Sequence, residues 1–140
     1  MKIDLKKVLT VSERSGLYLF ISESKSGQIV ESLADKKRTF LTARVRSGSL
    51  ADISIYNETG EVALQEVLER IKSLPPETVV PDAKSDPGLL KRFFEEVIPN
   101  YDRDRFYLSH MKKIVEWFHQ LRDNDMLDFE QEEDEENDSN

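Results

Sequence analysis

Short alternations of apolar and polar residues fill the first part of the chain. They cover residues 7–11, 17–21, 29–33 and 53–56. Pairs that favour turns separate them, namely Ser15-Gly16, Ser26-Gly27, Asp35-Lys36 and Ser47-Gly48. Short strands at such spacing, joined by turns, are typical of a small antiparallel sheet or barrel. The pattern predicts an N-terminal SH3-like β-barrel.

The apolar pattern then changes to helical spacing. Over residues 61–74 the apolar positions recur every three or four residues, and Pro75 and Pro76 end the predicted helix. Residues 86–98 predict a second helix, with Asp86 as its N-cap and Pro87 in the first turn. We expect Ser109 to cap a third helix that carries a broad apolar arc as far as residue 121.

These elements predict an α+β protein with four parts. Residues 1–74 form the SH3-like barrel with its trailing helix, and residues 75–85 form a proline-containing tether. Residues 86–122 form a helical hairpin. Residues 123–140 are an acidic tail, which we expect to be disordered because it has too little apolar surface to offset the entropy of ordering.

The net charge of −8 is unevenly distributed over the 140 residues. Residues 1–46 carry ten Lys or Arg against five Asp or Glu, which gives +5. Residues 123–140 carry ten acidic residues and no basic residue, which gives −10. The barrel is therefore basic and the tail acidic, which bears on partners more than on fold.

The sequence excludes several kinds of chemistry. With no Cys, it has no disulfide, no thiolate nucleophile and no cysteine metal site, which fits a cytoplasmic location. Glycines are few and isolated, so no phosphate-binding loop is present. His110 and His119 are nine residues apart and point about 180° from each other on one helix. No apolar run is long enough for a membrane span. We predict no enzymatic activity, no cofactor and no metal.

An alternation of Asn100, Asp102 and Asp104 suggests a calcium loop at first sight. Counted from Asn100, however, Arg105 stands at the sixth position, where glycine is needed, and Met111 stands at the twelfth, where Glu is needed. We therefore predict a turn held by Asx side chains and by ion pairs of the neighbouring arginines.

One basic group is a candidate contact site. A turn with Lys36 and Lys37, followed by strand residues Arg38, Arg44 and Arg46, would gather positive charge on one side of the barrel. Such a surface could contact a phosphate backbone or a protein partner. Ordinary edge-strand charges, which discourage aggregation, are the simpler explanation.

Several separated segments carry a family resemblance. They are residues 15–18, 28–38, 52–56, 80–84, 99–105 and 114–118. In these segments the chain resembles a family of small uncharacterised Bacteroidetes proteins that is classed only as a domain of unknown function. The resemblance covers residues 1–121. It implies a cytoplasmic bacterial protein with an SH3-like barrel and a helical C-terminal part, and it brings no activity or ligand.

Together these observations predict a non-catalytic interaction module, either an adaptor or an assembly subunit, whose partner is another protein. The alternative is a nucleic-acid-binding accessory factor of transcription or translation that uses the basic turn. We expect no membrane partner.

Overall fold

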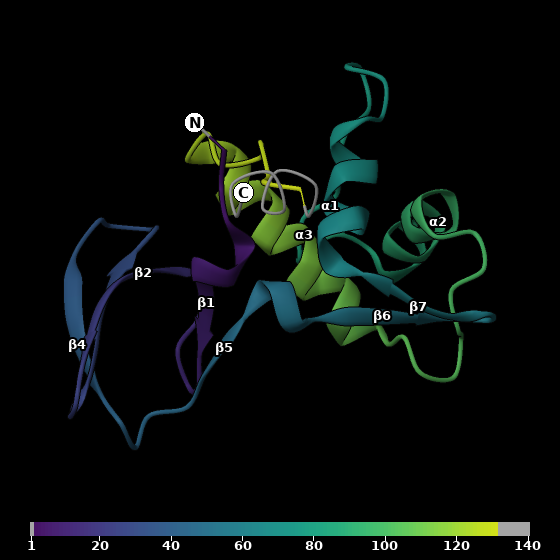
Figure 1. Cartoon of the computed structure of the whole chain (residues 1–140). Helices are drawn as coiled ribbons and strands as arrows, with labels where there is room; N and C mark the ends of the chain where they lie inside the picture. The colour runs from purple at the N-terminus through teal and green to yellow at the C-terminus, as the bar shows by residue number, and fades with distance from the viewer. Residues whose placement is uncertain (1, 132–140) are drawn as a thin grey trace.

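The computed structural model describes residues 2–131 and has the expected α+β class (Figure 1). The strands are β1 (Val8–Val11), β2 (Tyr18–Ser24), β3 (Gly27–Ser32), β4 (Arg38–Thr42), β5 (Ser47–Ser49), β6 (Ser54–Asn57) and β7 (Gly60–Ala63). The α-helices are α1 (Leu64–Lys72), α2 (Pro87–Val97) and α3 (Leu108–Asp123). Single 3₁₀ turns, η1 (Leu5–Lys7) and η2 (Leu50–Asp52), precede β1 and β6. No helix in residues 2–131 is long and apolar enough to cross a membrane.

The first five strands form one antiparallel sheet in the order β4-β3-β2-β1-β5. Strands β6 and β7 form a separate hairpin, with Ile55 opposite Val62. In Figure 1 the large sheet lies on one side of α3, and α1, α2 and the hairpin lie on the other. The dipeptide Ser47-Gly48, expected to be a turn, is instead part of the edge strand β5.

The large sheet is curled but open. Leu9, Val30 and Leu41, from three different strands, bury their side chains in one small cluster of their own. The side chain of Gln28 on β3 also donates a hydrogen bond to Ser47 Oγ at the start of β5, at 2.9 Å. Within residues 2–131, however, no strand pairing joins the edges β4 and β5. The closed barrel predicted from the sequence is therefore not formed.

Two of the three helix starts differ from the predictions. Residues 60–63 pair with β6 as β7, so α1 begins at Leu64 rather than at residue 61. Helix α3 begins at Leu108, with Tyr107 as its N-cap, so Ser109 lies inside it. The third start is confirmed, because Asp86 Oδ2 accepts a hydrogen bond from the Gly88 N–H at 3.0 Å.

A single large apolar core crosses the predicted domain boundaries. It runs from Leu5 before β1 to Phe129 after α3 and takes in buried residues of all three α-helices. The tether at residues 75–85 packs onto this core through Val80, and the carbonyl oxygen of Pro81 lies 2.9 Å from His119 Nε2. The two halves of the described chain therefore share one packed interior.

The expectation of disorder from residue 123 onward is wrong for the segment that follows α3. Met126 and Phe129 are buried. The Ile3 N–H donates to the Asp128 carbonyl at 2.6 Å, and the Glu130 N–H donates to the Ile3 carbonyl at 2.8 Å. So few apolar residues do not predict an ordered segment, because the residues that bury them come from distant parts of the chain. The rest of the predicted tail, residues 132–140, lies outside the described residues.

Candidate functional site: a cleft between β6 and α3

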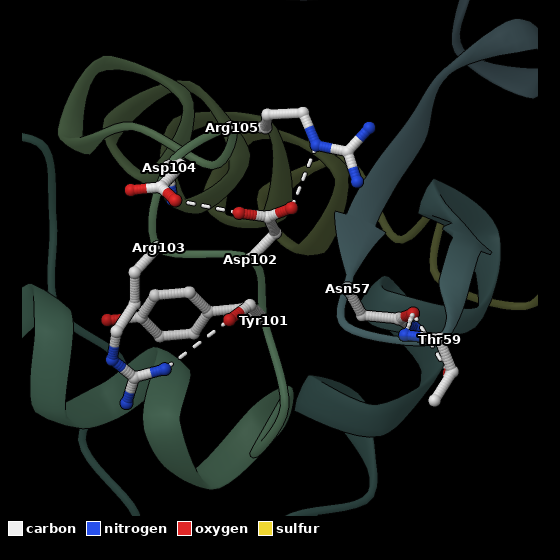
Figure 2. Close-up of polar contacts among 7 residues, drawn as sticks. All are labelled: Asn57, Thr59, Tyr101, Asp102, Arg103, Asp104 and Arg105. Carbon is white, nitrogen blue, oxygen red and sulfur yellow. Dashed lines mark hydrogen bonds and ion pairs between the residues drawn. The ribbon is translucent and has the colours of Figure 1, made fainter.

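The loop between α2 and α3 is organised by the carboxylate of Asp102. One carboxylate oxygen accepts a hydrogen bond from the Asp104 N–H at 2.8 Å, and the other accepts from Arg105 Nε at 2.8 Å (Figure 2). The hydrogen bond from Arg105 is the main reason why the pKa of Asp102 is lowered from its ordinary value of 3.8. The predicted Asx turn is confirmed, and the carboxylate is already occupied by donors of its own loop.

Arg103 holds the other side of the same loop. Its Nη1 donates to the Tyr101 carbonyl at 3.3 Å, and its Nη2 lies 3.5 Å from Glu95 Oε1 on α2. The guanidinium carbon also lies 4.6 Å from the centre of the Tyr101 ring. Both arginines of the loop therefore form the predicted ion pairs. No group of three or more His, Asp or Glu side chains in residues 2–131 is arranged to hold a metal ion.

The loop is also attached to the tip of the β6–β7 hairpin. The Asp102 N–H donates to the Tyr56 carbonyl at 3.0 Å, and the Glu58 N–H donates to the Asn100 carbonyl at 2.9 Å. In the hairpin turn, Asn57 Oδ1 accepts from the Thr59 N–H at 3.0 Å (Figure 2). Two elements far apart in the sequence thus form one rigid edge.

Aromatic side chains anchor this edge to the core. Tyr101 and Phe106 are both buried, with ring centres 5.5 Å apart, and Phe106 also packs edge-on against Phe94 of α2 at 5.4 Å. On the outside, the guanidinium of Arg105 stacks over Tyr56, which is 40% exposed. The hydrogen bond to Asp102 raises the pKa of Arg105, so the guanidinium stays charged at this exposed rim.

Between β6 and the start of α3 lies a cleft of about 280 Å³. Its lining residues are Ile53, Ser54, Ile55, Tyr56, Arg105, Phe106, His110, Lys113, Ile114 and Trp117. Ile55, Phe106 and Ile114 are almost fully buried and form an apolar floor. Arg105 and Lys113 supply two cationic side chains and His110 supplies an imidazole, and none of the lining residues is acidic. The volume is just below the ~300–1,000 Å³ of typical small-molecule sites.

The hydrogen bonds of His110 limit what the cleft can do. Its Nδ1 lies 3.2 Å from the backbone N–H of Tyr107 and accepts a hydrogen bond from it. In the neutral ring the proton then resides on Nε2, so His110 offers the cleft a donor and not a base. Ser54, which supplies the cleft's aliphatic hydroxyl, makes no hydrogen bond to His110 within the described chain.

The predicted basic group is divided between the two ends of β4. Lys36 and Lys37 lie in the turn before Arg38, where Lys36 Nζ donates to Asn124 Oδ1. Arg44 and Arg46 lie in the turn after β4 and not in a strand. Since β4 has five residues, its two ends are four steps, or about 13 Å, apart at roughly 3.3 Å per residue.

Arg38, at the start of β4, is already paired, with its Nε 3.3 Å from Glu31 Oε1 on β3. The five residues therefore do not form one cluster. None of them lines the cleft.

The cleft was not predicted from the sequence, although part of the signal was present. His110, Lys113, Ile114 and Trp117 follow the i, i+3, i+4, i+7 spacing of one helical face. A half-polar face of this kind, next to a buried apolar face, could have marked a binding surface. Its other wall, β6, is about 55 residues earlier in the chain and is brought there only by the fold.

Two domain families match consecutive parts of the chain. Residues 5–50 match a domain of unknown function (DUF5606), and residues 53–121 match a second domain of unknown function (DUF6852). The division falls at η2, ahead of the tether where the boundary was predicted. The cleft lies wholly within the second match. The comparison with curated proteins found no match.

Among solved structures, the chain is similar to a structural genomics target from Bacteroides vulgatus, determined by solution NMR. The two share 40% sequence identity, the match covers 86% of this chain and 87% of that chain, and the TM-score is 0.69. The chain therefore belongs to the family of small proteins of unknown function that this Bacteroides vulgatus structure represents.

Proposed function

We propose that this protein is a non-catalytic interaction module, an adaptor or assembly subunit that binds another protein through the cleft between β6 and α3. The observation that carries the proposal is the composition of the cleft, which has an apolar floor beside two cationic side chains and one imidazole and has no acidic lining residue. Apolar contact with a few placed polar groups is the usual basis of selective binding.

The state of His110 supports a binding role over a catalytic one. A nucleophilic hydroxyl needs a base whose free nitrogen can accept its proton. His110 Nδ1 is taken by the Tyr107 N–H, at 3.2 Å, so Nε2 carries the proton in the neutral ring. A hydrolase would also need a group that orients the base, and here a backbone N–H occupies that position.

The test is crosslinking from the cleft in living cells. A photoreactive p-benzoylphenylalanine in place of Tyr56 keeps an aromatic ring under Arg105 and places the reactive group at the rim. The matched control carries the same group in place of Val79, which is 86% exposed and lies outside the cleft. We expect discrete protein adducts from position 56 that are absent from position 79. Equal adduct patterns at both positions would contradict the proposal.

Nucleic-acid binding remains the second candidate, supported by the basic side chains at the ends of β4. Nuclease treatment of a cell lysate, followed by crosslinking in that lysate, distinguishes the two, because adducts that depend on nucleic acid are lost. We also propose that the protein is cytoplasmic. We propose further that the curled sheet is related to SH3-like barrels, because it is curved in the same way and has an apolar cluster of its own.

A further inference from the structure

The outer edge of β6 has backbone groups without partners. Antiparallel pairs alternate, so every second residue directs its N–H and C=O away from the neighbouring strand. The Leu64 N–H donates to the Ile53 carbonyl at 2.9 Å, which places Ile53 in a hydrogen-bonded pair. By the same alternation, Ile55 directs its backbone N–H and C=O toward β7. Ser54 and Tyr56 direct theirs to the other side, away from β7.

The loop after α2 covers only the end of this edge. The Asp102 N–H donates to the Tyr56 carbonyl, and the pairing stops there. Within residues 2–131, the Tyr56 N–H and both backbone groups of Ser54 have no hydrogen-bond partner. An open strand edge can be extended by another chain. Here the same residues, Ser54 and Tyr56, line the apolar cleft.

The charges around the cleft indicate the chemistry of the partner. Asp102 and Glu61 face Arg105, so its charge is partly balanced by its own chain. Lys113 is exposed and forms no ion pair in the described part of the chain. His110 also lines the cleft, three residues before Lys113 on α3, and its Nε2 has no hydrogen-bond partner among the described residues. A carboxylate is the group that would satisfy these donors.

We propose that the cleft binds an acidic, extended segment of a partner protein, which adds as a strand to the outer edge of β6. Its backbone hydrogen-bonds to both backbone groups of Ser54 and to the Tyr56 N–H. One apolar side chain enters the 280 Å³ cleft, and a neighbouring Asp or Glu contacts Lys113 and His110. This inference rests on the proposed function, and it specifies both the partner's chemistry and its conformation.

A display library of random dodecapeptides, selected on the full chain, tests the proposal. We expect enriched peptides to carry an acidic residue within two positions of a large apolar residue. Trp117 is the only tryptophan and lines the cleft, so its fluorescence reports binding of the selected synthetic peptides directly. Lys113→Glu should weaken that binding at least tenfold. Lys91→Glu, the same charge change at an exposed position of α2 outside the cleft, should not.

Backbone methylation separates strand addition from simple charge attraction. N-methylation at alternate positions removes the donors that a peptide would offer to Ser54, and we expect at least tenfold weaker binding at one of the two registers. Three outcomes would each overturn the proposal. They are enriched peptides that lack acidic residues, binding to the Lys113→Glu variant as strong as to the wild type, and no effect of methylation at either register. Protein adducts from position 56 would still stand in that case, so failure here is distinguishable from failure of the proposed function.

His110→Glu gives an independent check on the role of the imidazole. Glutamate at the third helical position can still accept from the N-cap N–H, so α3 keeps its start, and unlike glutamine it has no N–H to donate to a carboxylate. We expect weaker peptide binding at an unchanged melting temperature. Unchanged binding would remove His110 from the site and contradict the proposed carboxylate contact.

Discussion

The guanidinium carbon of Arg105 lies 4.3 Å from the centre of the Tyr56 ring, and Arg105 Nε donates a hydrogen bond to the carboxylate of Asp102. One side chain thus joins the α2–α3 loop to the β6–β7 hairpin, and it does so at the mouth of the cleft. Cation–π contacts at exposed sites are worth only ~0.5–1 kcal/mol. The role we infer for Arg105 is therefore to position the rim rather than to hold the fold together.

The Asp102–Arg105 pair should give a pH-dependent contribution to stability. The folded-state pKa of Asp102 is lowered, so its stabilising effect is present above the ordinary pKa of 3.8 and is lost as the pH falls through the folded value. Asp102→Asn keeps an oxygen for the Asp104 N–H but removes the charge. We expect the variant to melt below the wild type at pH 7, with a smaller difference at pH 3, which lies below the ordinary pKa of 3.8. Thermal melts at both pH values check this, and a difference that is independent of pH would contradict it.

The C-terminal segment should stabilise the fold through Phe129. Its ring is 3% exposed, so Phe129→Ala should lower the free energy of unfolding by about 3–5 kcal/mol. Truncation after Gln131 is the matched control, because it leaves Phe129 and the bonds to Ile3 in place. Urea denaturation measures both. A loss below about 1 kcal/mol for Phe129→Ala would mean that the segment is not docked in solution.

Gln120 should couple the two halves of the chain. Its Oε1 accepts a hydrogen bond from the Leu17 N–H at 2.7 Å, and this bond joins α3 to the turn before β2. Gln120→Leu leaves that N–H without its partner and should cost about 1–3 kcal/mol. Gln120→Glu retains an acceptor oxygen and should cost less. Equal losses in the two variants, measured by chemical denaturation, would show that packing matters here rather than the hydrogen bond.

The nucleic-acid alternative now makes a sharper prediction, because the basic residues lie at the two ends of β4, which are about 13 Å apart at roughly 3.3 Å per residue. Each phosphate contact contributes about 0.7–0.9 to the slope of log affinity against log salt. One change replaces Lys36 and Lys37 with Gln, and a separate change replaces Arg44 and Arg46 with Gln. If nucleic acid contacts one end of β4 more than the other, these two variants should reduce the slope of log affinity against log salt by unequal amounts.

The acidic end of the chain offers the complementary test. Deleting residues 132–140 removes six acidic side chains and should strengthen any such binding. No binding at low salt by this truncated chain would exclude nucleic acid as the partner.

Local patterns in the sequence determined several strands, one helix start and one turn of this protein. The strands predicted at residues 17–21 and 29–33 correspond to β2 and β3, and the Asp86-Pro87 helix start and the Asx turn at Asp102 are also present, since each depends on neighbours within a few residues. The α+β class followed from the change of apolar period along the chain. The resemblance to a family of unknown function likewise depends on short segments of the sequence, and the domain matches confirm it.

Only the tertiary structure decided which distant surfaces meet. Val62 suits a helix by spacing, but its pairing with Ile55 makes it part of a strand. Phe129 directly precedes the most acidic run of the sequence, yet Ile3, near the N-terminus, pairs with it in an isolated β-bridge. The cleft needs β6 and α3 side by side, and the basic residues around β4 are divided because a strand separates them. In each case the deciding contact joins residues that no local pattern connects, and it forms only because the fold buries more apolar surface that way.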